Sequence, residues 1–559
     1  MINKLKIKFG SSPSKPPLEV DTTPITVFVG PNNSGKSKVL IEIQSFCNNG
    51  NISTTDVILN GLDFAPLPDP DGEINKHTLA PKPNELVQPG HIIYGKGTWR
   101  NQVHRGNLLT FLSDTSGQRQ NFCGYYASFN TIRIDGGSRI NLIQPQPTGD
   151  LQAHPNNSLG VLFKDNSKRS EVRRIIFDAF KKYFVIDPTN SGQLRIRLSD
   201  TAPADEIQER GLHEDAIEFH RKAVEITLAS DGVKAFTGII TTLVAGDPKI
   251  ILIDEPEAFL HPSLASNLGK EVSNSVNGTF KNLFVSTHSA NFLMGCIQSG
   301  VPINIIRLTY SNNIPTARIL PGDKVLKLMR HPLLRSIGVL NGLFYEYVIV
   351  TEADSDRAFY QEINERLLAD SGKGIPNCLF LNAQNKQTIH EIVRPLREMG
   401  IPCAAIVDVD VVKEGGTVWT NLLSSACVPE VTIIATGTSR GQIMSKFNAK
   451  VEADSKPINF KIKGGVDVLD AGDREACNNL FDQLDDYGIF AVRKGELESW
   501  LKPLTATGHG SDWLIEIFEQ LGEDPAATSY VRPGTDDVWA FVEKIKTWFT
   551  TPVRKGIPE

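Results

Sequence analysis

Short apolar runs of strand length, each followed by a polar turn and a helix-like pattern, occur in two separate regions of the chain. The first region contains ITVFVG (25–30) and KIILIDEP (249–256). The second contains YVIVTEAD (347–354), CAAIVDVDVV (403–412) and YGIFAVRKGELESWL (487–501). Continuous apolar runs without alternation are typical of parallel strands covered on both faces. The pattern therefore predicts two α/β regions.

A long stretch between the two runs of the first region, from about residue 50 to 220, is predicted to be an insertion. It is rich in Gly, Pro and Asn until about residue 160. SEVRRIIFDAFKKYF (170–184) then has helical spacing, and QLRIRLS (193–199) alternates like a strand. Prolines 315, 321 and 332 favour a junction at 326–345. We therefore expect one domain over 1–325 and another over 346–559.

Near the end of the chain, apolar residues repeat with the spacing of an amphipathic helix. The helix is predicted to begin at Thr535, with Asp536 and Asp537 in its first turn. Packing on the second domain is favoured over a membrane role. The apolar positions are Val538, Phe541, Val542, Ile545, Trp548 and Phe549.

Composition limits the class of protein. A chain of 559 residues is too long for one hydrophobic core, and 40% hydrophobic with 22% charged residues is ordinary for a soluble protein. The net charge of −6 neither indicates nor excludes nucleic-acid binding. The seven cysteines form no CxxC pair, which argues against a zinc ribbon. The start lacks a signal-peptide core and no stretch approaches the ~20 apolar residues of a membrane span, so we expect a cytoplasmic protein.

The polar loop after the first apolar run has the features that phosphate binding needs. Glycines let backbone N–H groups turn inward, and the following helix N-terminus attracts negative charge. A lysine reaches the β- and γ-phosphates, and a hydroxyl binds Mg²⁺. The predicted nucleotide-binding residues here are Gly30, Asn33, Ser34, Gly35, Lys36 and Ser37.

Three further residues complete a predicted ATP–Mg²⁺ site. Asp254 ends the apolar run IILID, where it can hold Mg²⁺, and Glu255 is positioned to orient or deprotonate the attacking water. Farther along, NLFVSTH ends in His288, which can contact the γ-phosphate. The spacing thus predicts ATP binding.

These elements resemble the ATP-binding-cassette type of P-loop ATPase found in SMC, Rad50 and RecF proteins. Such ATPases have a signature segment upstream of the Asp-Glu strand, and LASDGVKAF occupies that place with Ser230, Asp231 and Gly232. This Ser-Asp-Gly departs from the Ser-Gly-Gly form of transporters. In the family the signature of one subunit closes over the nucleotide of another, so the resemblance implies a homodimer or higher assembly.

Acidic residues follow the strand ends of the second region. Glu352 follows YVIVT, and Asp356 lies where a helix is predicted to begin. Asp408 and Asp410 are two apart, so both side chains of an extended segment would point the same way. Converging carboxylates suit Mg²⁺, and one or two such ions serve phosphodiester cleavage. Glu498 completes the predicted metal set.

Other charged residues near these strand ends have two interpretations each. Lys494 is expected either to stabilise charge near the scissile phosphate or to be a surface lysine. Asp354 and Glu496 are interpreted as solvated caps rather than ligands.

A strand-end Glu followed about 55 residues later by Asp-x-Asp resembles the Toprim domain of topoisomerases, primases and certain nucleases. A cassette ATPase followed by a Toprim domain resembles the OLD (overcoming lysogenization defect) family of ATP-dependent endonucleases. Relatives of this family include the nuclease subunit of the Gabija antiphage system and effectors of some retrons.

The resemblance implies an ABC-type P-loop ATPase domain over 1–325, with a helical and β insertion at about 50–220. A Toprim-like α/β domain with C-terminal helices would follow over 346–559. It also implies metal-dependent cutting of DNA under nucleotide control, in defence against phage. Mg²⁺ or Mn²⁺ would serve the Toprim site, and an operon-encoded defence partner is possible.

Basic residues of the segment 166–184 and of the strand after it are candidates for phosphate contacts with DNA, with a solvated helix face as the equal alternative. Two other functions stay open. One is an ATP-driven sensor or scaffold whose Toprim-like half binds a partner. The other is a RecF- or SMC-like DNA-repair ATPase without nuclease activity. The basic residues are Lys168, Arg169, Arg173, Arg174, Lys181, Lys182, Arg195 and Arg197.

Overall fold

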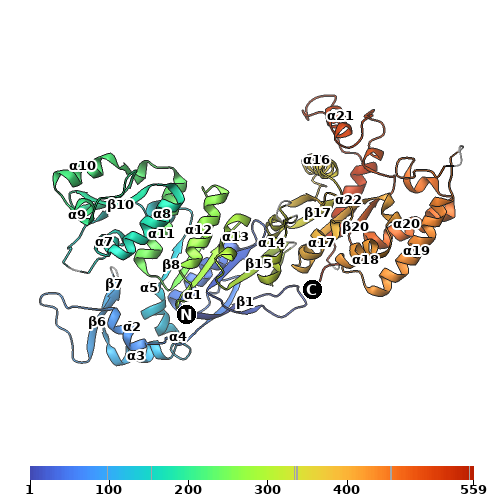
Figure 1. Cartoon of the computed structure of the whole chain (residues 1–559). Coiled ribbons are helices and arrows are strands. Elements are labelled where there is room, and N and C mark those ends of the chain that lie inside the picture. The colour runs from blue at the N-terminus through green and yellow to red at the C-terminus, as the bar shows by residue number, and fades with distance from the viewer. Residues whose placement is uncertain are drawn as a thin grey trace. The chain divides into compact units, whose positions relative to one another are not determined.

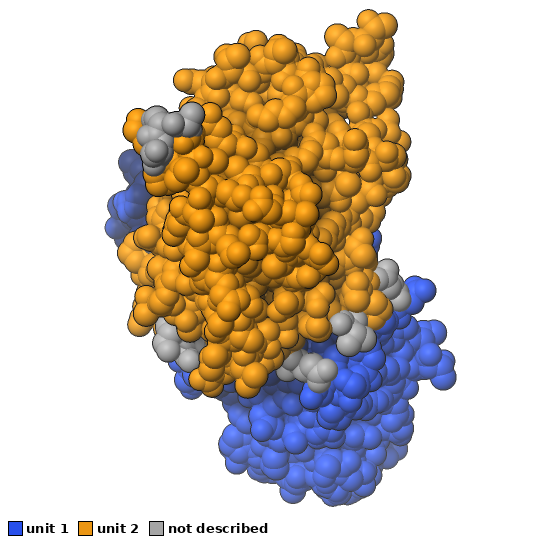
Figure 2. All heavy atoms as spheres, turned by 90° about the vertical axis from the view of Figure 1, so that its right-hand side faces the viewer, with its two compact units in different colours: residues 1–322 blue, residues 323–559 orange. Residues whose placement is uncertain are grey.

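The computed structural model divides into two compact units, Met1–Gly322 and Asp323–Glu559 (Figures 1 and 2). It describes residues 1–559 except 97–98, 153, 312, 321, 333, 335–337, 453–455, 553 and 559, together with the side chains of 323, 324 and 327. The division falls just before the predicted junction at 326–345. Pro321, one of the prolines used for that prediction, lies outside the described residues.

Unit 1 is built around a six-stranded sheet with the order β16-β15-β3-β14-β13-β8. Neighbouring strands are parallel except for the hairpin of β15 and β16. Every residue of β3 and β14 is buried, which explains their continuous apolar runs. The strands are β3 (Ile25–Val29), β8 (Thr131–Ile134), β13 (Ile250–Asp254), β14 (Asn282–Ser286), β15 (Ile303–Ser311) and β16 (Ile314–Leu320).

One helix of unit 1, α1 (Lys36–Asn49), packs between this sheet and a small antiparallel sheet. Val39, Leu40 and Ile43 of α1 share one buried core with Phe28 of the main sheet and Leu5 of the small sheet. The small sheet has the order β2-β1-β4. Its strands are β1 (Ile2–Ile7), β2 (Glu19–Asp21) and β4 (Leu59–Phe64).

The prediction of a continuous insertion over 50–220 is wrong in part. β4 and β8 lie inside that range, yet β4 belongs to the small sheet and β8 forms an edge of the main sheet. Periodicity did not reveal β8, because its four residues are too short a run to stand out. Two outlying regions remain: β5-β6-β7 form one sheet, and β10-β11-β12 with β9 form another.

The elements of these outlying regions have the following bounds. The first holds α2 (Pro70–Lys76), β5 (Thr78–Leu79), β6 (His91–Lys96), β7 (Trp99–His104) and α3 (Arg105–Ser113). The second holds β9 (Gln146–Pro147), α7 (Ser158–Lys164), α8 (Asn166–Phe180), β10 (Tyr183–Asn190), β11 (Gln193–Ser199), α9 (Glu206–Arg210), α10 (Glu214–Lys222) and β12 (Val224–Glu225).

Most of the arginines predicted to contact DNA are used inside unit 1. Arg169 is only 2% exposed and donates to Glu209 over 2.9 Å, and Arg173 pairs with the same carboxylate. Arg195 and Arg197 donate to the buried Asp187 over 2.7 and 2.6 Å. The predicted DNA surface is therefore wrong for these four residues, because helical spacing does not reveal a carboxylate that arrives from another element.

Unit 2 has a parallel sheet with the order β18-β17-β19-β20. Phe359 of α16 and Ile545 of α22 share a buried core with Ile349 of β17. The strands are β17 (Tyr347–Thr351), β18 (Cys378–Asn382), β19 (Cys403–Asp408) and β20 (Ile489–Val492). The main helices are α14 (Gly322–Arg330), α16 (Asp354–Ser371), α17 (Ile389–Glu398), α18 (Gly416–Ser425), α19 (Glu430–Asn448), α20 (Ala471–Asp485), α21 (Ser511–Leu521) and α22 (Asp537–Thr550).

The predicted C-terminal helix is α22, which packs on unit 2 as expected. It begins at Asp537 with Asp536 as its N-cap, two residues later than the Thr535 start that the sequence predicted. Its apolar face is buried, and Trp548 Nε1 donates to the Asp486 carbonyl over 3.0 Å. Among the described residues, no helix has the length and apolar character that crossing a membrane requires.

The paired arginines make a testable contribution to the stability of unit 1. Glu209→Ala would leave Arg169 and Arg173 without their shared carboxylate, so we expect about 3 kcal/mol of destabilisation. The matched control Glu206→Ala removes an exposed carboxylate of the same helix and should cost under about 0.5 kcal/mol. Calorimetric unfolding measures both, and equal midpoints for the two variants would contradict the buried pairing.

Candidate nucleotide and metal sites

The loop between β3 and α1 has the backbone of a phosphate cradle. Gly30 and Gly35 have φ of 143° and 94°, and Asn33 has φ of 61°. A Cβ on Gly30 would lie 2.0 Å from the Leu308 carbonyl oxygen, so only glycine fits there. Gly35 is the N-cap of α1 and supplies no side-chain bond, which leaves the first N–H groups of the helix for an anion.

Lys36 projects its ammonium back over this loop. Its Nζ donates to the carbonyls of Gly30 over 2.9 Å and Pro31 over 2.7 Å. Burial lowers the pKa of Lys36 to about 8, and the charge of Glu255 opposes that shift. The loop thus holds a buried cation where nucleotide phosphates are expected.

Ser37 and Asp254, 217 residues apart, meet beside this lysine. Ser37 Oγ donates to Asp254 Oδ1 over 2.8 Å, and Ser286 Oγ bonds the same oxygen. A hydroxyl and a carboxylate side by side are the oxygen donors that Mg²⁺ prefers. The structure thus brings together the two residues that the sequence predicted as Mg²⁺ ligands.

Glu255 has an unusual backbone for a residue with a side chain. Its φ is 48°, and its N–H donates to the Ser286 carbonyl over 2.9 Å. The carboxylate is 47% exposed and lies 3.4 Å from His288 Nε2. Burial lowers the pKa of His288, and Lys36 lowers it further, so the imidazole is neutral at pH 7. An accessible carboxylate thus lies beside a neutral imidazole.

Two residues around Glu255 were missed from the sequence. Glu257 Oε1 accepts from the His288 N–H over 2.7 Å, and burial raises the pKa of Glu257. Arg139 donates to the main-chain oxygens of both Asp254 and Glu255. Glu257 could have been predicted as a site residue, because it is close in sequence to Asp254 and Glu255. Arg139 could not, because it lies more than a hundred residues upstream and no nearby motif marks it.

The predicted signature residues form the start of α11 (Asp231–Gly246), with Ser230 as the N-cap. Ser230 and Asp231 are exposed, and Asp231 pairs with Lys234 over 3.1 Å. A Cβ on Gly232 would lie 2.6 Å from the Phe259 carbonyl oxygen, so glycine permits this close approach. The helix N-terminus is thus presented at the surface of unit 1.

Three of the predicted carboxylates of unit 2 converge. Carboxylate oxygens of Glu352, Asp408 and Asp410 all lie within 4.8 Å of one another. Glu352 Oε1 also accepts from the Asp408 N–H over 3.0 Å. β17 and β19 are neighbouring parallel strands, so the residues that follow their ends meet at one edge of the sheet.

Asp410 reaches this cluster by a route that the sequence did not predict. The expectation was an extended Asp-x-Asp segment, but β19 ends at Asp408 and Val409–Lys413 is a 3₁₀ helix. The main-chain bond from Val409 N–H to the Gly495 carbonyl, 3.0 Å long, ends the strand there. The turn, rather than strand alternation, brings Asp410 beside Asp408.

Asp356 and Glu498 lie around the three converging carboxylates. Asp356 accepts from the Ala353 N–H over 2.9 Å at the start of α16. Burial raises the pKa of Asp356 to about 7, and the charges of Asp408 and Glu498 add to the rise. Glu498 Oε1 lies 2.7 Å from His509 Nδ1, and Glu496, Glu498 and His509 form a second group within 4.8 Å.

The interpretation of Glu496 as a solvated cap is wrong. Its side chain is buried, 3.4 Å from Lys461 Nζ, and burial raises its pKa. Asp354, in contrast, is exposed and pairs with Arg357 over 2.7 Å, as expected of a cap.

Lys494 does not join the carboxylate cluster. It lies 2.7 Å from Asp537, because Gly495 with φ of 136° turns the chain between Lys494 and Glu496. The lysines at the cluster are Lys461, 2.8 Å from Asp408, and Lys386, 2.6 Å from Asp410. The closeness of Lys494 to Glu496 in the sequence therefore does not place Lys494 at the carboxylates.

Lys461 comes from a segment in which the sequence offered no motif. Its loop is held against the turn before Glu496, since a Cβ on Gly495 would lie 2.2 Å from the Lys461 carbonyl oxygen. Only this tertiary contact brings the lysine to the carboxylates.

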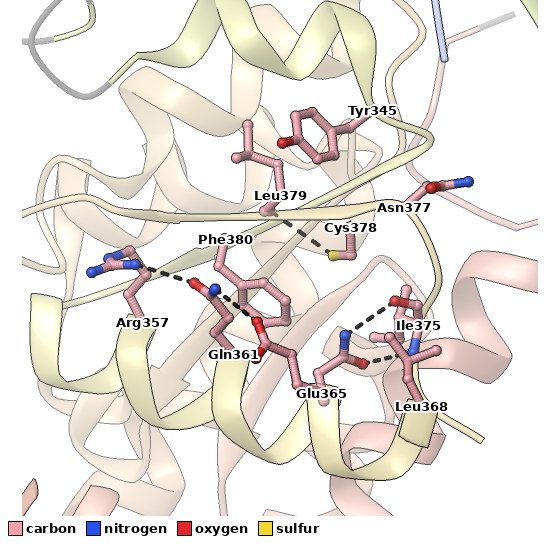
Figure 3. A pocket seen from close by; sticks show the side chains of 11 residues that line it. Tyr345, Arg357, Gln361, Glu365, Leu368, Ile375, Asn377, Cys378, Leu379 and Phe380 are labelled. Atoms are coloured by element: carbon pink, nitrogen blue, oxygen red, sulfur yellow. Dashed lines mark hydrogen bonds between the residues drawn. The ribbon is translucent and has the colours of Figure 1, made fainter. Parts of the chain in front are cut away.

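A cavity of about 320 Å³ lies beside α16 and β18 (Figure 3). A polar row along α16 borders it: Arg357 donates to Gln361 over 3.2 Å, and Gln361 donates to Glu365 over 2.9 Å. Phe380 of the edge strand β18 lines it as well. None of the predicted metal carboxylates lines this cavity, so it is separate from the candidate metal site.

Comparison with known families gives one match in each unit. Residues 97–294 match a family described as "AAA domain, putative AbiEii toxin, Type IV TA system". Residues 343–410 match "Overcoming lysogenization defect protein-like, TOPRIM domain". The first range contains Asp254, Glu255 and His288, and the second contains Glu352, Asp356, Asp408 and Asp410.

A curated relative, the Old nuclease of Escherichia phage P2, is 25% identical over 265 residues. The match spans 45% of this chain and 43% of that relative, less than half the relative's length. Among solved structures, the SMC head domain from Thermotoga maritima is 14% identical with a TM-score of 0.30, covering 57% of this chain and 99% of that one. An SMC head bound to the C-winged helix domain of ScpA is 14% identical with a TM-score of 0.34, covering 58% and 99%.

The two family matches follow the same order as the two units, and the curated relative is itself an Old nuclease. Each match contains acidic residues at the ends of parallel strands. The chain thus contains an AAA-type ATPase domain followed by a Toprim domain like that of overcoming lysogenization defect proteins, and it is similar to the Old nuclease of Escherichia phage P2.

Proposed function

We propose that this protein is an ATP-binding and ATP-hydrolysing, divalent-metal-dependent DNA endonuclease that acts in defence against phage. The observation that carries the nuclease proposal is the convergence of Glu352, Asp408 and Asp410 within 4.8 Å in the Toprim unit. The match to the Old nuclease of a phage supports nuclease activity and phage as the context.

In unit 1, each residue of the nucleotide site has a proposed role. The glycine loop and the N-terminus of α1 bind phosphate, Lys36 neutralises it, and Ser37 with Asp254 would hold Mg²⁺. Glu255 accepts a proton from the attacking water, since its carboxylate is accessible. His288 contacts the γ-phosphate as a neutral donor.

In unit 2, the carboxylates have the chemistry of a hard-metal site. All are oxygen donors, and burial together with the neighbouring carboxylates raises the pKa of Glu352 and of Asp408. Such a set favours a divalent cation, because a cation relieves the repulsion. Glu352, Asp408 and Asp410 would hold Mg²⁺ or Mn²⁺, with Asp356 and Glu498 in support. When bound, the ion supplies charge neutralisation and an activated water.

We further propose that unit 1 works as a homodimer or higher assembly. The exposed N-terminus of α11, with Ser230, Asp231 and Gly232, is the part that would close over the nucleotide of another copy. An operon-encoded partner is compatible with this arrangement.

One observation favours the alternative of an ATPase sensor without cutting activity. Lys386 and Lys461 already pair with Asp410 and Asp408 at 2.6 and 2.8 Å, so each of these carboxylates has an internal counter-ion. In that case the Toprim unit would bind a partner rather than cleave DNA.

Plasmid cleavage with Mg²⁺ or Mn²⁺ decides between these functions. Asp408→Ala should reduce cleavage by at least about 100-fold, because it removes the central carboxylate. The control Asp354→Ala removes an exposed carboxylate of the same unit and should cut like wild type. Cleavage that survives Asp408→Ala would remove the Toprim assignment, and a wild type that hydrolyses ATP but never cuts would favour the sensor.

ATP hydrolysis is predicted to depend on Glu255. Glu255→Gln should lower kcat about 10²- to 10⁴-fold with little change in nucleotide affinity, because the amide cannot accept the proton. Lys36→Ala should instead abolish nucleotide binding. Steady-state phosphate release and fluorescent-nucleotide titration separate the two effects. Parallel loss of binding in Glu255→Gln would assign that residue to binding rather than chemistry.

Metal affinity of the carboxylate cluster is predicted to rise with pH. The pKa of Asp356 is raised to about 7, so below pH 7 this carboxyl is protonated and a metal must displace the proton. The pKa of Glu352 is raised to about 8, so affinity for Mn²⁺ should increase through both titrations, by up to about tenfold per pH unit for each carboxyl that loses its proton, and level off only above about pH 9. Calorimetric titration in two buffers measures affinity and proton release, and pH-independent affinity would contradict the shifted pKa.

A further inference from the structure

Arg139 is a buried cation whose side-chain hydrogen bonds, among the residues that the structure describes, all go to main-chain oxygens. It is 1% exposed, and it donates to the carbonyls of Asp254 over 2.7 Å, Glu255 over 2.6 Å and Asp135 over 3.3 Å. Burying a guanidinium is costly unless its donors are satisfied, so this position is specific. The planar fork of Arg bridges two successive carbonyls, which a lysine ammonium cannot do in the same way.

The carbonyls that Arg139 holds belong to a strained turn. Glu255 has φ of 48°, a left-handed conformation that persists only where surrounding bonds fix it. Its carbonyl also accepts from the Ala258 N–H over 3.1 Å, and its own N–H donates to Ser286. Arg139 is thus one of the few contacts that set where the Glu255 carboxylate points.

The main chain of Arg139 lies against a different element. Arg139 is in the short helix α6 (Ser138–Asn141), and a Cβ on Gly238 of α11 would lie 2.7 Å from the Arg139 carbonyl oxygen. α11 begins at the exposed segment Ser230–Gly232. One residue therefore contacts α11 with its backbone and the Glu255 turn with its side chain.

We infer that Arg139 is a positioning residue that couples the placement of α11 to the conformation of Glu255. A shift of α11, such as one imposed by a ligand at its N-terminus, moves α6 through the Gly238 contact and changes the bonds that hold the Glu255 turn. The effect on catalysis rests on the proposed ATP hydrolysis, whereas the role of Arg139 in holding the Glu255 turn does not depend on it.

Two variants of the 559-residue chain break the coupling at different points. Arg139→Lys removes the fork, and Gly238→Ala pushes α11 and α6 apart while placing a better helix former within α11. Arg169→Lys is the matched control: Arg169 is similarly buried in unit 1 and also donates to two main-chain carbonyls. Its side-chain hydrogen bonds go to Leu162, Phe163, Asn166 and Glu209 rather than to α11 or the Glu255 turn.

Both test variants should lower kcat for ATP by at least about tenfold while nucleotide affinity stays within about threefold of wild type. Hydrogen exchange of the backbone amides of Glu255, Glu257 and Ala258 should become faster in both variants. Arg169→Lys should lower the thermal midpoint without either effect.

Unchanged exchange at 255–258 in Arg139→Lys and Gly238→Ala overturns the inference, as does a kcat loss matched by Arg169→Lys. If wild type hydrolyses no ATP, the proposed function fails, while the exchange measurement still decides whether Arg139 holds the Glu255 turn. Faster exchange with unchanged kcat would also overturn the coupling, because the turn would then be irrelevant to hydrolysis.

Discussion

Parallel pairing of neighbouring strands is the constraint on which both sites depend. Parallel strands end at one edge of a sheet, so whatever follows them is gathered there. In unit 1 this brings Asp254 beside Ser286, and in unit 2 it brings Glu352 beside Asp408. The order of the strands in each sheet therefore determines which residues meet at the site, and the side chains at those positions determine its chemistry.

The sequence predicted the two sheets and most strand-end residues, because buried parallel strands are continuous apolar runs and their polar ends stand out. It failed wherever a contact came from a distant element. Lys461 and Arg139 lie in segments without periodicity, and Glu209 neutralises Arg169 from another helix. Lys494 was misplaced because a single glycine conformation reverses the chain beside it.

The two sites handle charge in opposite ways. Unit 1 buries a lysine among acidic residues, and burial lowers the pKa of Lys36. Unit 2 gathers carboxylates that outnumber their paired lysines, Lys386 and Lys461, and the pKa of Asp356 rises. The first arrangement suits an anion such as a phosphate, and the second suits a cation. The charged residues around each site therefore indicate the sign of the charge on its proposed ligand.

The left-handed backbone at Glu255 sets a conflict between stability and activity. At this positive φ, a residue other than glycine or asparagine lowers the stability of the folded state by on the order of 1 kcal/mol. Directed selection for thermostability alone would therefore tend toward glycine at this position and lose the carboxylate. A survey of the stability changes caused by substitutions across the chain would then show an increase for Glu255→Gly. That increase would point to Glu255 as a functional residue before any activity had been assayed.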